Sequence, residues 1–138
     1  MAENTMSVEK ESVVTIDDLS RLPEAAKTER PVKAIVYQVG AIEIASFRLR
    51  PAAVISAHLH TNVRDLFVGL RGRGTVQYEV DGEVRIHDLR EHSFCGVPAN
   101  IPHEVRNVDD KEDLVFLLVH APFAGYDHVK TAFSGELR

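Results

Sequence analysis

The sequence has one cysteine, no tryptophan and no long hydrophobic run. A single thiol, Cys95, excludes an internal disulfide, and with it the small secreted scaffolds that depend on several bridges. A membrane-spanning helix needs about 20 consecutive apolar residues, and no run approaches that length. A chain of 138 residues that is 44% hydrophobic therefore has to rely on an ordinary buried core, which this length can supply.

Excess positive charge is also missing. The chain has 16 lysines and arginines against 21 acidic residues, which gives a net charge of −5. It has neither the basic patch nor the aromatic ladder that is typical of nucleic-acid binding. The N-terminal stretch MAENTMSVEK lacks the basic region and apolar segment of a signal peptide. We therefore expect a cytoplasmic protein that binds neither nucleic acid nor membranes.

Long helical patterns are absent, and short alternating runs of apolar residues take their place. Their period of two is typical of strands. Asp81-Gly82 between two of these runs predicts a two-residue hairpin turn, because both positions of such a turn favour a positive φ. Closely spaced short strands of this kind predict an all-β sandwich or barrel. We expect strands at residues 32–39, 41–49, 52–60, 65–70, 75–80, 83–89, 93–98, 103–108 and 113–121.

Residues 1–138 are expected to form one domain. Residues 1–12 are polar and predict a flexible arm, and residues 13–26 predict a short strand followed by a helical turn capped by Asp or Ser. The barrel itself is expected over residues 32–121. The remaining tail, APFAGYDHVKTAFSGELR, predicts a loop with a short helix.

Three histidines and one aspartate stand out within the predicted strands. His58 and His60 are two residues apart, so both side chains point to the same face of a strand. Asp65 opens the next predicted strand, and an adjacent antiparallel strand would bring it beside the two histidines. His103 opens a later strand and completes a set of three imidazoles and one carboxylate. Burying such groups without partners costs several kcal/mol, so we expect a metal ion among them.

This ligand set suits one divalent transition metal. Imidazole and carboxylate bind Fe(II), Mn(II), Ni(II), Zn(II) and Cu(II), and the ligands alone do not choose among these ions. Four protein ligands on a six-coordinate ion leave about two positions for water, substrate or dioxygen. A catalytic site needs such open positions, whereas a structural zinc site avoids them.

The region around these residues resembles the first motif of the cupin family. That motif is a Gly, five residues, His-x-His, three or four residues, Glu, six residues and Gly. Here Ala52 stands in place of the first Gly, His58 and His60 form the pair, Asp65 follows after four residues, and Gly72 after six more.

The second cupin motif is a Gly, five residues, Pro-x-Gly, two residues, His, three residues and Asn. The sequence is similar to it, with His92, Pro98, Asn100, His103 and Asn107 at these positions. The two motifs and their flanking strands cover residues 32–121. The resemblance implies a jelly-roll β-barrel with a metal near one mouth.

The sequence departs from these motifs at four positions. Ala52, His92 and Asn100 replace turn glycines, which should perturb loops rather than the barrel. Asp65 replaces a glutamate and is one methylene shorter. Either the longer spacer lets its carboxylate ligate the metal directly, which we favour, or Asp65 orients a histidine from outside and leaves three histidines as ligands.

Strand alternation also suggests which residues line a substrate pocket. Phe67 is expected on the face of Asp65, and Val105 and Asn107 on that of His103. Arg64 is expected to hold a substrate carboxylate or to form a salt bridge at the rim. The full set of pocket candidates is Arg64, Phe67, Val105, Asn107, Tyr37 and Gln38.

The remaining histidines and the cysteine have plainer interpretations. His87 lies among charged residues and is expected to be exposed, and His92 is expected in a surface turn. His120 ends the last long strand and is expected at an interface or at the rim, with a place in the cavity lining as the alternative. His128, in GYDHV, lies on the surface or belongs to a lid over the barrel mouth. Cys95 is expected to fill the core as a small buried thiol.

The first functional hypothesis is a mononuclear metal enzyme that acts on a small organic molecule. With Fe(II), the first choice of metal, it is a dioxygenase or another oxygenase. The alternative is a Lewis-acid isomerase, lyase or cyclase of a biosynthetic pathway, whose acid or base would be Glu79, Tyr78 or His120. A further alternative is a cupin that binds a small molecule without turnover.

Cupins commonly form dimers by exchanging or packing edge strands. The resemblance therefore implies a homodimer, and the run SVVTI at residues 12–16 is a candidate strand for it.

Overall fold

Almost every regular element of the structure is a strand. The computed structural model describes residues 12–24, 30–122 and 125–137. In these segments the single helical element is η1 (Leu19–Arg21), a 3₁₀ turn that Asp18 caps by accepting a hydrogen bond from the Ser20 amide at 3.0 Å. The strands are β1 (Val32–Val39), β2 (Ile42–Leu49), β3 (Val54–Leu59), β4 (Arg64–Arg71), β5 (Arg73–Val80), β6 (Glu83–Arg90), β7 (Phe94–Val97), β8 (His103–Asn107), β9 (Leu114–Ala121), β10 (Val129–Lys130) and β11 (Glu136–Leu137).

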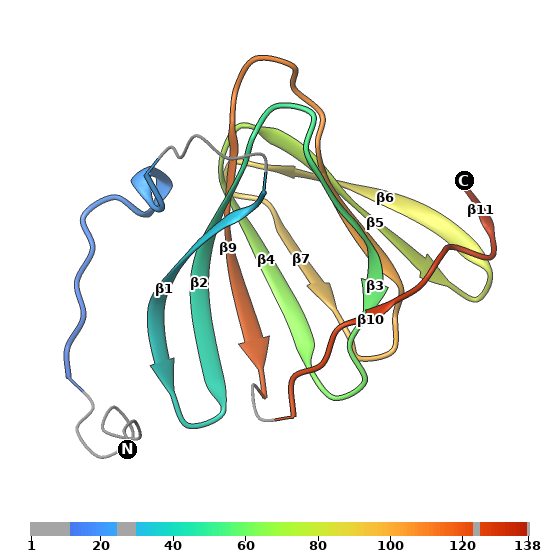
Figure 1. The fold of residues 1–138 in the computed structure, drawn as a ribbon, viewed down its shortest axis with the longest axis horizontal. Helices are drawn as coiled ribbons and strands as arrows, with labels where there is room; N and C mark the ends of the chain where they lie inside the picture. The colour runs from blue at the N-terminus through green and yellow to red at the C-terminus, as the bar shows by residue number, and fades with distance from the viewer. Residues whose placement is uncertain (1–11, 25–29, 123–124, 138) are drawn as a thin grey trace.

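The strands form two sheets that face each other (Figure 1). One sheet has the order β1-β2-β9-β4-β7 and the other has the order β10-β3-β8-β5-β6-β11. Neighbouring strands pair antiparallel, apart from the parallel pair of β6 and β11. The consecutive strands β3 and β4 belong to different sheets, so residues 60–63 carry the chain across the gap. This confirms the predicted all-β jelly-roll barrel.

Each of the nine predicted strands overlaps one of the strands β1 to β9. The hairpin between β5 and β6 also forms as predicted. Asp81 and Gly82 have φ angles of 53° and 78°, and they alone join the two strands. The close agreement has a physical basis, because most of these strands bury one face against the other sheet and therefore alternate in burial.

The core lies between the two sheets. Phe67 of one sheet and Val105 of the other are almost completely buried, and the rings of Phe67 and Phe116 lie 5.7 Å apart. Burying a side chain of this kind contributes roughly 1.5–3 kcal/mol. Phe67 and Val105 also line the cavity that holds the candidate site, so the site rests directly on the packed core.

Two segments differ from the predictions. The described part of the tail has no helix; instead β10 pairs with β3, and β11 pairs with β6. Edge strands offer unpaired backbone groups, and the tail satisfies them. Residues 12–16 form no strand, so β1 is an edge strand of the sheet β1-β2-β9-β4-β7. The predicted helical turn is confirmed as η1. The predicted flexible arm falls mainly outside the described residues.

Three turn residues adopt a left-handed backbone although they are not glycine. Ala52, His92 and Asn100 have φ angles of 63°, 71° and 66°. These are the three positions at which the sequence lacks a motif glycine. For residues other than Gly and Asn, this conformation costs roughly 1–2 kcal/mol. The neighbouring strands still pair, regularly between β4 and β7 and with a register shift between Ile55 and His58 of β3.

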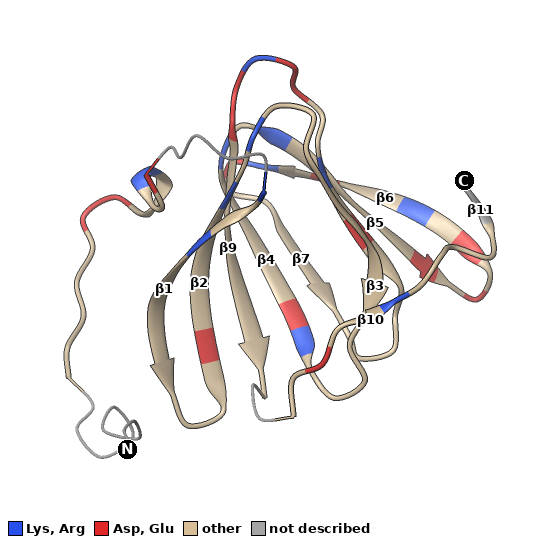
Figure 2. Ribbon diagram, in the orientation of Figure 1, with Lys and Arg blue, Asp and Glu red and all other residues tan. Residues whose placement is uncertain are grey.

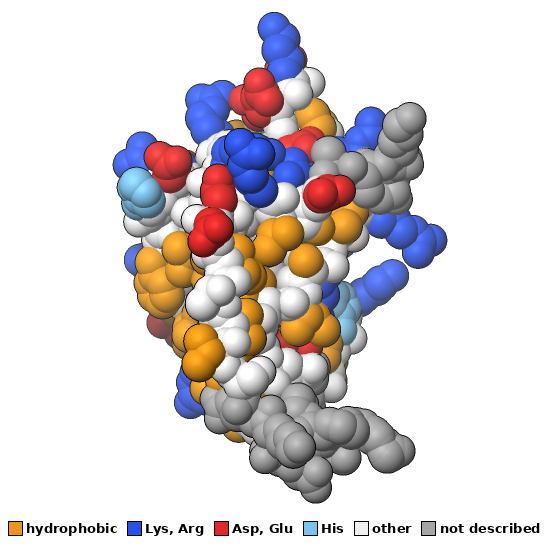
Figure 3. Space-filling model, turned by 90° about the vertical axis from the view of Figure 1, so that its left-hand side faces the viewer, with side chains coloured by type: hydrophobic (Ala, Val, Ile, Leu, Met, Phe, Trp, Pro, Cys, Tyr) orange, Lys and Arg blue, Asp and Glu red, His pale blue; other side chains and the backbone are white. Residues whose placement is uncertain are grey.

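The outer surface combines charged and apolar regions. Among the described residues, no helix is long and apolar enough to cross a membrane. Figure 3 shows hydrophobic side chains gathered on the side of the molecule where η1 and β1 lie. On β1 and β2, Ile35 is 56% exposed and Ile42 is 42% exposed.

Candidate metal centre

The candidate site lies between the two sheets, where β3 ends and β4 begins (Figure 1). His58 of β3 is opposite His103 of β8, which places both imidazoles on the same face. His60 directly follows β3, and Asp65 is the second residue of β4. Asp65 therefore meets the histidines across the gap between the sheets. The sequence predicted that Asp65 would reach the histidines from an adjacent antiparallel strand. That prediction is wrong, because residues 60–63 carry the chain from one sheet to the other.

The four predicted ligands come together closely. The ligand atoms of His58, His60, Asp65 and His103 all lie within 4.8 Å of one another. All four side chains are buried, with exposed fractions of 5% or less. Within the part of the chain that the structure describes, no other group of three or more His, Cys, Asp or Glu residues meets in this way.

Backbone carbonyl groups fix the orientation of each imidazole. Nδ1 of His58 lies 2.8 Å from the carbonyl oxygen of Ser56, and Nδ1 of His103 lies 2.9 Å from that of Ile101. Nδ1 of His60 contacts the carbonyl oxygen of Asp127. A carbonyl oxygen can only accept a hydrogen bond, so each Nδ1 carries its proton and donates it. The Nε2 atoms are thereby left as the metal-binding atoms.

Two of these Nε2 atoms face a carboxylate. They belong to His60 and His103 and lie 3.1 Å and 2.9 Å from Oδ2 of Asp65. In a neutral imidazole whose proton is on Nδ1, Nε2 is an acceptor, and so is the carboxylate oxygen. Two facing acceptors repel each other unless a proton or a cation lies between them. The donor set therefore fits a divalent metal ion.

The pKa values agree with this arrangement. Burial lowers the pKa of His58 to about 4, so its imidazole is neutral near neutral pH, as a metal ligand has to be. Burial also acts to lower the pKa of His60, but the hydrogen bond and charge of Asp65 outweigh it and raise the pKa. Burial acts to raise the pKa of Asp65, yet the surrounding imidazoles of His103, His120 and His60 hold it well below its usual range. The carboxylate is therefore ionised.

Residues 125–130, here called the C-terminal lid, pack over the histidines. The ring of Tyr126 lies 4.9 Å from the rings of both His60 and His120. The ring of His128 stacks on that of His58 at 4.1 Å, with an interplanar angle of 10°. His128 is exposed, as predicted for a surface residue, and its segment also packs over the histidines, as predicted for a lid.

Asp127 fastens this lid to the loop between β3 and β4. Its carboxylate accepts hydrogen bonds from the amide of Thr61 at 2.8 Å and from the Thr61 hydroxyl at 2.7 Å. These bonds lower the pKa of Asp127, so it stays ionised. Because the carbonyl oxygen of the same residue contacts His60, the anchor of the lid also orients a candidate ligand.

The site opens into a cavity of about 180 Å³, here called the histidine cavity. Its walls are largely apolar, as in small-molecule sites, and its polar groups gather around the four candidate ligands. No lysine or arginine is among the described residues that line it. The lining residues are Pro31, Phe47, Ile55, His58, His60, Asp65, Phe67, Val105, Leu118, His120, Tyr126 and His128.

A row of buried polar side chains crosses the sheet beside the site. Strand pairing places His120 of β9 opposite both Asp65 of β4 and Glu43 of β2. Nε2 of His120 lies 3.1 Å from Oδ1 of Asp65, and Nδ1 lies 3.6 Å from Oε1 of Glu43. Asp65 and Glu43 are the acidic residues of β4 and β2, and Figure 2 shows both red bands toward the same end of the sheet. We call Glu43, His120 and Asp65 the buried polar row.

Phe67 and Val105 line the histidine cavity as predicted, but the other pocket candidates do not. Arg64 is exposed, because it precedes the inward-facing Asp65 and points the other way. Asn107 has the right strand parity but lies at the far end of β8, where its amide donates to three carbonyl groups of nearby loops.

Tyr37 and Gln38 are also outside this lining. Gln38 is exposed and donates a hydrogen bond to Oε2 of Glu43 at 3.2 Å. It therefore supports the buried polar row from outside instead of contacting a substrate. Both residues belong to β1, and β2 lies between β1 and the strands that carry the site.

Glu79, a predicted acid or base, faces away from the histidine cavity. Its carboxylate accepts hydrogen bonds from the amide of Ser134 at 3.0 Å and from the Ser134 hydroxyl at 2.7 Å. These bonds lower its pKa. Along β5 the inward-facing residue is Val76, and Glu79 has the opposite parity. The C-terminal segment covers this outer face, so Glu79 is buried without lining the site.

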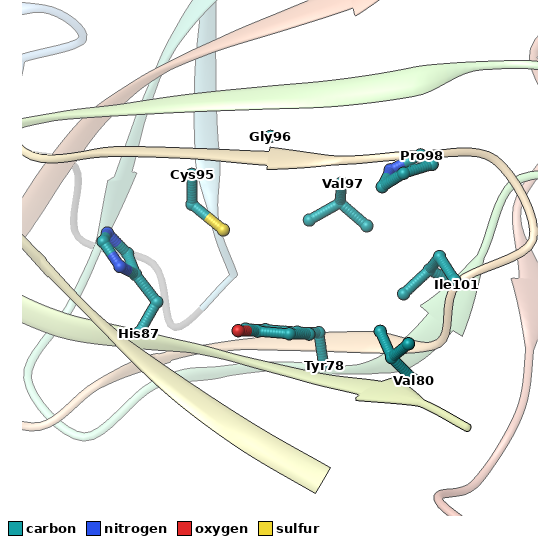
Figure 4. Close-up of a pocket in the computed structure, with 8 residues that line it drawn as sticks. All are labelled: Tyr78, Val80, His87, Cys95, Gly96, Val97, Pro98 and Ile101. Carbon is teal, nitrogen blue, oxygen red and sulfur yellow. The ribbon is translucent and has the colours of Figure 1, made fainter. Parts of the chain in front are cut away.

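Tyr78 lines a second cavity, of about 220 Å³ (Figure 4). Figure 4 shows the Tyr78 hydroxyl, the His87 ring and Sγ of Cys95 toward one end of it, and apolar side chains toward the other. Burial raises the pKa of Cys95, which keeps it a thiol. His87, predicted to be exposed, is half-buried here, and Cys95 packs against the core as predicted. The lining residues are Tyr78, Val80, His87, Cys95, Gly96, Val97, Pro98 and Ile101.

Glu43 was missed in the sequence, and Tyr126 was predicted only as part of the candidate lid segment. Glu43 shares strand parity with the inward-facing Ala45 and Phe47, and an acidic residue on an apolar strand face is a detectable signal. Tyr126 gave no such signal, because it follows the last long strand in a segment without periodicity.

Comparisons with known proteins agree with the fold and the motifs. No curated protein matches the sequence. The structure is similar to the protein TT1209 of Thermus thermophilus, with a TM-score of 0.66 and 26% identity, covering 78% of this chain and 96% of the other. It is also similar to a conserved protein with a double-stranded β-helix domain from Klebsiella pneumoniae, with a TM-score of 0.65 and 18% identity, covering 84% and 97%.

An oxalate oxidase solved in complex with glycolate has a similar fold, with a TM-score of 0.66 and 13% identity, covering 83% of this chain and 64% of the other. The family model of the cupin domain matches residues 45–120, more than half of the chain and the region that holds all four candidate ligands. This protein belongs to the cupin family.

Proposed function

We propose that this cupin is a mononuclear metal-dependent enzyme that transforms a small organic molecule, with His58, His60, Asp65 and His103 as the metal ligands. One observation carries the proposal: three imidazoles with fixed Nδ1 protons and one ionised carboxylate converge within 4.8 Å, beside a cavity. Histidines that only filled the core would not need the proton to lie on Nδ1 in all three rings, which leaves every Nε2 available to a metal ion. The Asp65 carboxylate ligates the metal directly in this proposal.

Four protein ligands leave about two coordination positions open on a six-coordinate ion. A bound divalent metal would supply either one-electron chemistry with dioxygen or Lewis-acid polarisation of a substrate oxygen. Fe(II) is the first candidate, and Mn(II), Ni(II), Zn(II) and Cu(II) also suit these ligands.

The chain itself shapes and closes the reaction space. A volume of about 180 Å³ equals that of about six water molecules at roughly 30 Å³ each, so the substrate is small. The apolar walls formed by Phe47, Phe67 and Leu118 limit the entry of water. The C-terminal lid covers the histidines, and release of its Asp127 anchor would admit substrate.

The oxygenase is favoured because two of the three acids or bases predicted for a Lewis-acid reaction lie outside the histidine cavity. Of the three predicted acids or bases, Glu79 bonds Ser134 outside the cavity and Tyr78 lines the second cavity. The third, His120, is held by Asp65. A Lewis-acid isomerase or lyase would depend on such a group, whereas oxidation of a chelating substrate depends mainly on the open coordination positions.

Oxygen consumption tests this proposal. Anaerobically purified protein is reconstituted with Fe(II) and given small hydroxy, keto and dicarboxylic acids, and oxalate and glycolate are tried first because of the similar oxalate oxidase. We expect substrate-dependent loss of dioxygen that is abolished by Zn(II) and by His103→Ala. His92→Asn, which changes an exposed turn histidine, is the matched control and should retain activity.

Other outcomes distinguish the alternatives. Turnover with Zn(II) under argon would favour the Lewis-acid isomerase, lyase or cyclase and contradict the oxygenase. A tightly bound molecule that is released unchanged after long incubation would favour a binding protein without turnover.

A homodimer remains part of this proposal. The apolar side around β1 supports it, with Ile35 56% exposed on an edge strand (Figure 3). Light scattering coupled to size-exclusion chromatography should give twice the chain mass of 15.4 kDa, and Ile35→Lys should shift it toward the monomer.

A further inference from the structure

The buried polar row lies at one level across three neighbouring strands. Glu43 of β2 pairs with His120 of β9, and His120 pairs with Asp65 of β4. Their exposed fractions are 2%, 4% and 1%. Lys33 completes the row at its outer end, with Nζ 2.7 Å from Oε1 of Glu43. Such a row is costly to bury unless its members hold one another, and hydrogen bonds from Lys33 and Gln38 fix Glu43 at its outer end.

The two oxygens of Asp65 have different partners. Oδ2 faces the candidate ligands His60 and His103, at 3.1 Å and 2.9 Å. Oδ1 faces Nε2 of His120, at 3.1 Å. His120 also lines the histidine cavity, but it is not one of the four residues whose ligand atoms converge, and its Nε2 lies against Oδ1. His120 therefore lies beside one oxygen of Asp65 and the candidate ligands lie beside the other.

The length of Asp65 makes this contact important. The first cupin motif has a glutamate at this position, and aspartate is one methylene shorter. A shorter side chain reaches a given point over a narrower range of rotations, so its carboxylate needs a fixed orientation.

On the basis of the proposed metal site, we infer that His120 is a positioning residue: it holds Oδ1 of Asp65 so that Oδ2 is presented to the metal. Glu43 supports it by facing Nδ1 at 3.6 Å, and Lys33 and Gln38 hold Glu43 in turn. Outer contacts of this kind change metal affinity by about 10–100-fold when they are removed.

Two amide substitutions that differ in reach test this inference. His120→Gln keeps a donor long enough to reach Asp65, whereas the amide of His120→Asn is too short. The dissociation constant of Co(II) is measured on metal-free protein by competition with a chelator, with circular dichroism as the folding control. We expect His120→Asn to weaken binding about 10–100-fold and His120→Gln to stay within about threefold of the parent protein.

Lengthening the carboxylate provides the decisive readout. In the His120→Asn background, Asp65→Glu should recover most of the lost affinity, because glutamate reaches the metal without being held. In the parent protein the same change should give no gain. A merely structural role of His120 would not produce this rescue. His87→Asn, in the second cavity, is the matched control and should leave Co(II) binding unchanged.

The outcomes separate this inference from the proposed function. Absence of Co(II) binding in the parent protein overturns both. Binding by the parent protein that is equally tight in His120→Asn, or a loss that Asp65→Glu does not repair, overturns the positioning role alone. If His120→Asn does not fold, His120→Leu, which fills the space without a donor, is measured in its place.

Discussion

The histidine cavity and the second cavity have similar volumes, about 180 Å³ and about 220 Å³. They differ in how their histidines are held. In the first, Nδ1 of His58 and of His60 each contacts a backbone carbonyl oxygen. In the second, Nε2 of His87 is buried and has no hydrogen-bond partner among the described residues. The difference therefore lies in the backbone carbonyl groups that orient the imidazoles of the histidine cavity.

This difference shows that fixed donors, and not volume, identify the candidate site. The second cavity contains a tyrosine, a histidine and a cysteine, but burial keeps the Cys95 thiol protonated and no carboxylate lines the space among the described residues. Functional groups near each other are common in proteins, whereas several donors that are oriented toward one point require supporting contacts.

The largest expected effect comes from removing the carboxylate of the histidine cavity. Asp65→Asn keeps the shape of the side chain and removes its charge. Its effect on Zn(II) affinity should exceed the roughly 10–100-fold that loss of an outer contact produces. Chelator competition measures it. Cys95→Ala, the matched change in the second cavity, should leave the Zn(II) affinity unchanged. Similar losses of affinity in both variants would contradict the difference between the two cavities.

The pH dependence of stability should come next in size. The pKa of His58 is about 4 in the folded protein, against 6.5 for an ordinary histidine. Below pH 6.5, His58 takes up a proton in the unfolded chain but stays neutral in the folded chain. Its contribution to the free energy of unfolding is therefore fully present above pH 6.5 and is lost as the pH falls toward 4. In metal-free protein this amounts to about 2 kcal/mol.

Urea unfolding at several pH values measures this loss. His58→Phe should flatten the curve between pH 6.5 and 4, because its side chain takes up no proton in either state. Equal slopes in the two proteins would contradict a buried neutral imidazole at this position.

A smaller effect is expected at the C-terminal lid. Asp127→Ala removes both hydrogen bonds to Thr61, so amide hydrogen exchange in residues 125–130 should be faster by roughly tenfold. Asp109→Ala is the matched control, because Asp109 also accepts from two amides, those of Lys111 and Glu112, in a loop that is not part of the lid. Unchanged exchange in the Asp127 variant would contradict the anchor.

The smallest effect is expected in the turn between β6 and β7, next to the second cavity. His92→Gly removes a left-handed non-glycine residue and should stabilise the protein by about 0.5–1 kcal/mol, once the entropy of glycine is subtracted. Thermal unfolding measures it. Glu91→Gly, in the same turn without a positive φ, should destabilise instead, and metal affinity should not change in either variant.

Local patterns were sufficient to predict the strands and the four clustered residues. Alternation located each of the strands β1 to β9, because burial of one face imposes a period of two. The spacing of His58, His60, Asp65 and His103 located the candidate site because strand parity and the motif positions are both local properties of the chain.

Long-range packing explains the residues that were placed wrongly. On β5, Val76 and Glu79 belong to opposite faces that are both covered, and the cover of the outer face is the distant segment around Ser134. Asn107 has the correct face but lies at the wrong end of its strand. The role of His120 depends on the register of β2, β9 and β4, which no local pattern fixes.

Metal content tests the central claim most directly. Protein purified without oxygen is analysed by inductively coupled plasma mass spectrometry, together with His58→Ala, His103→Ala and the second-cavity control His87→Ala. We predict close to one divalent metal ion per chain in the parent and the control, and almost none in the two ligand variants. Lack of metal in the parent after reconstitution with Fe(II), Mn(II), Ni(II) and Zn(II), or full metal content in both ligand variants, would contradict the account.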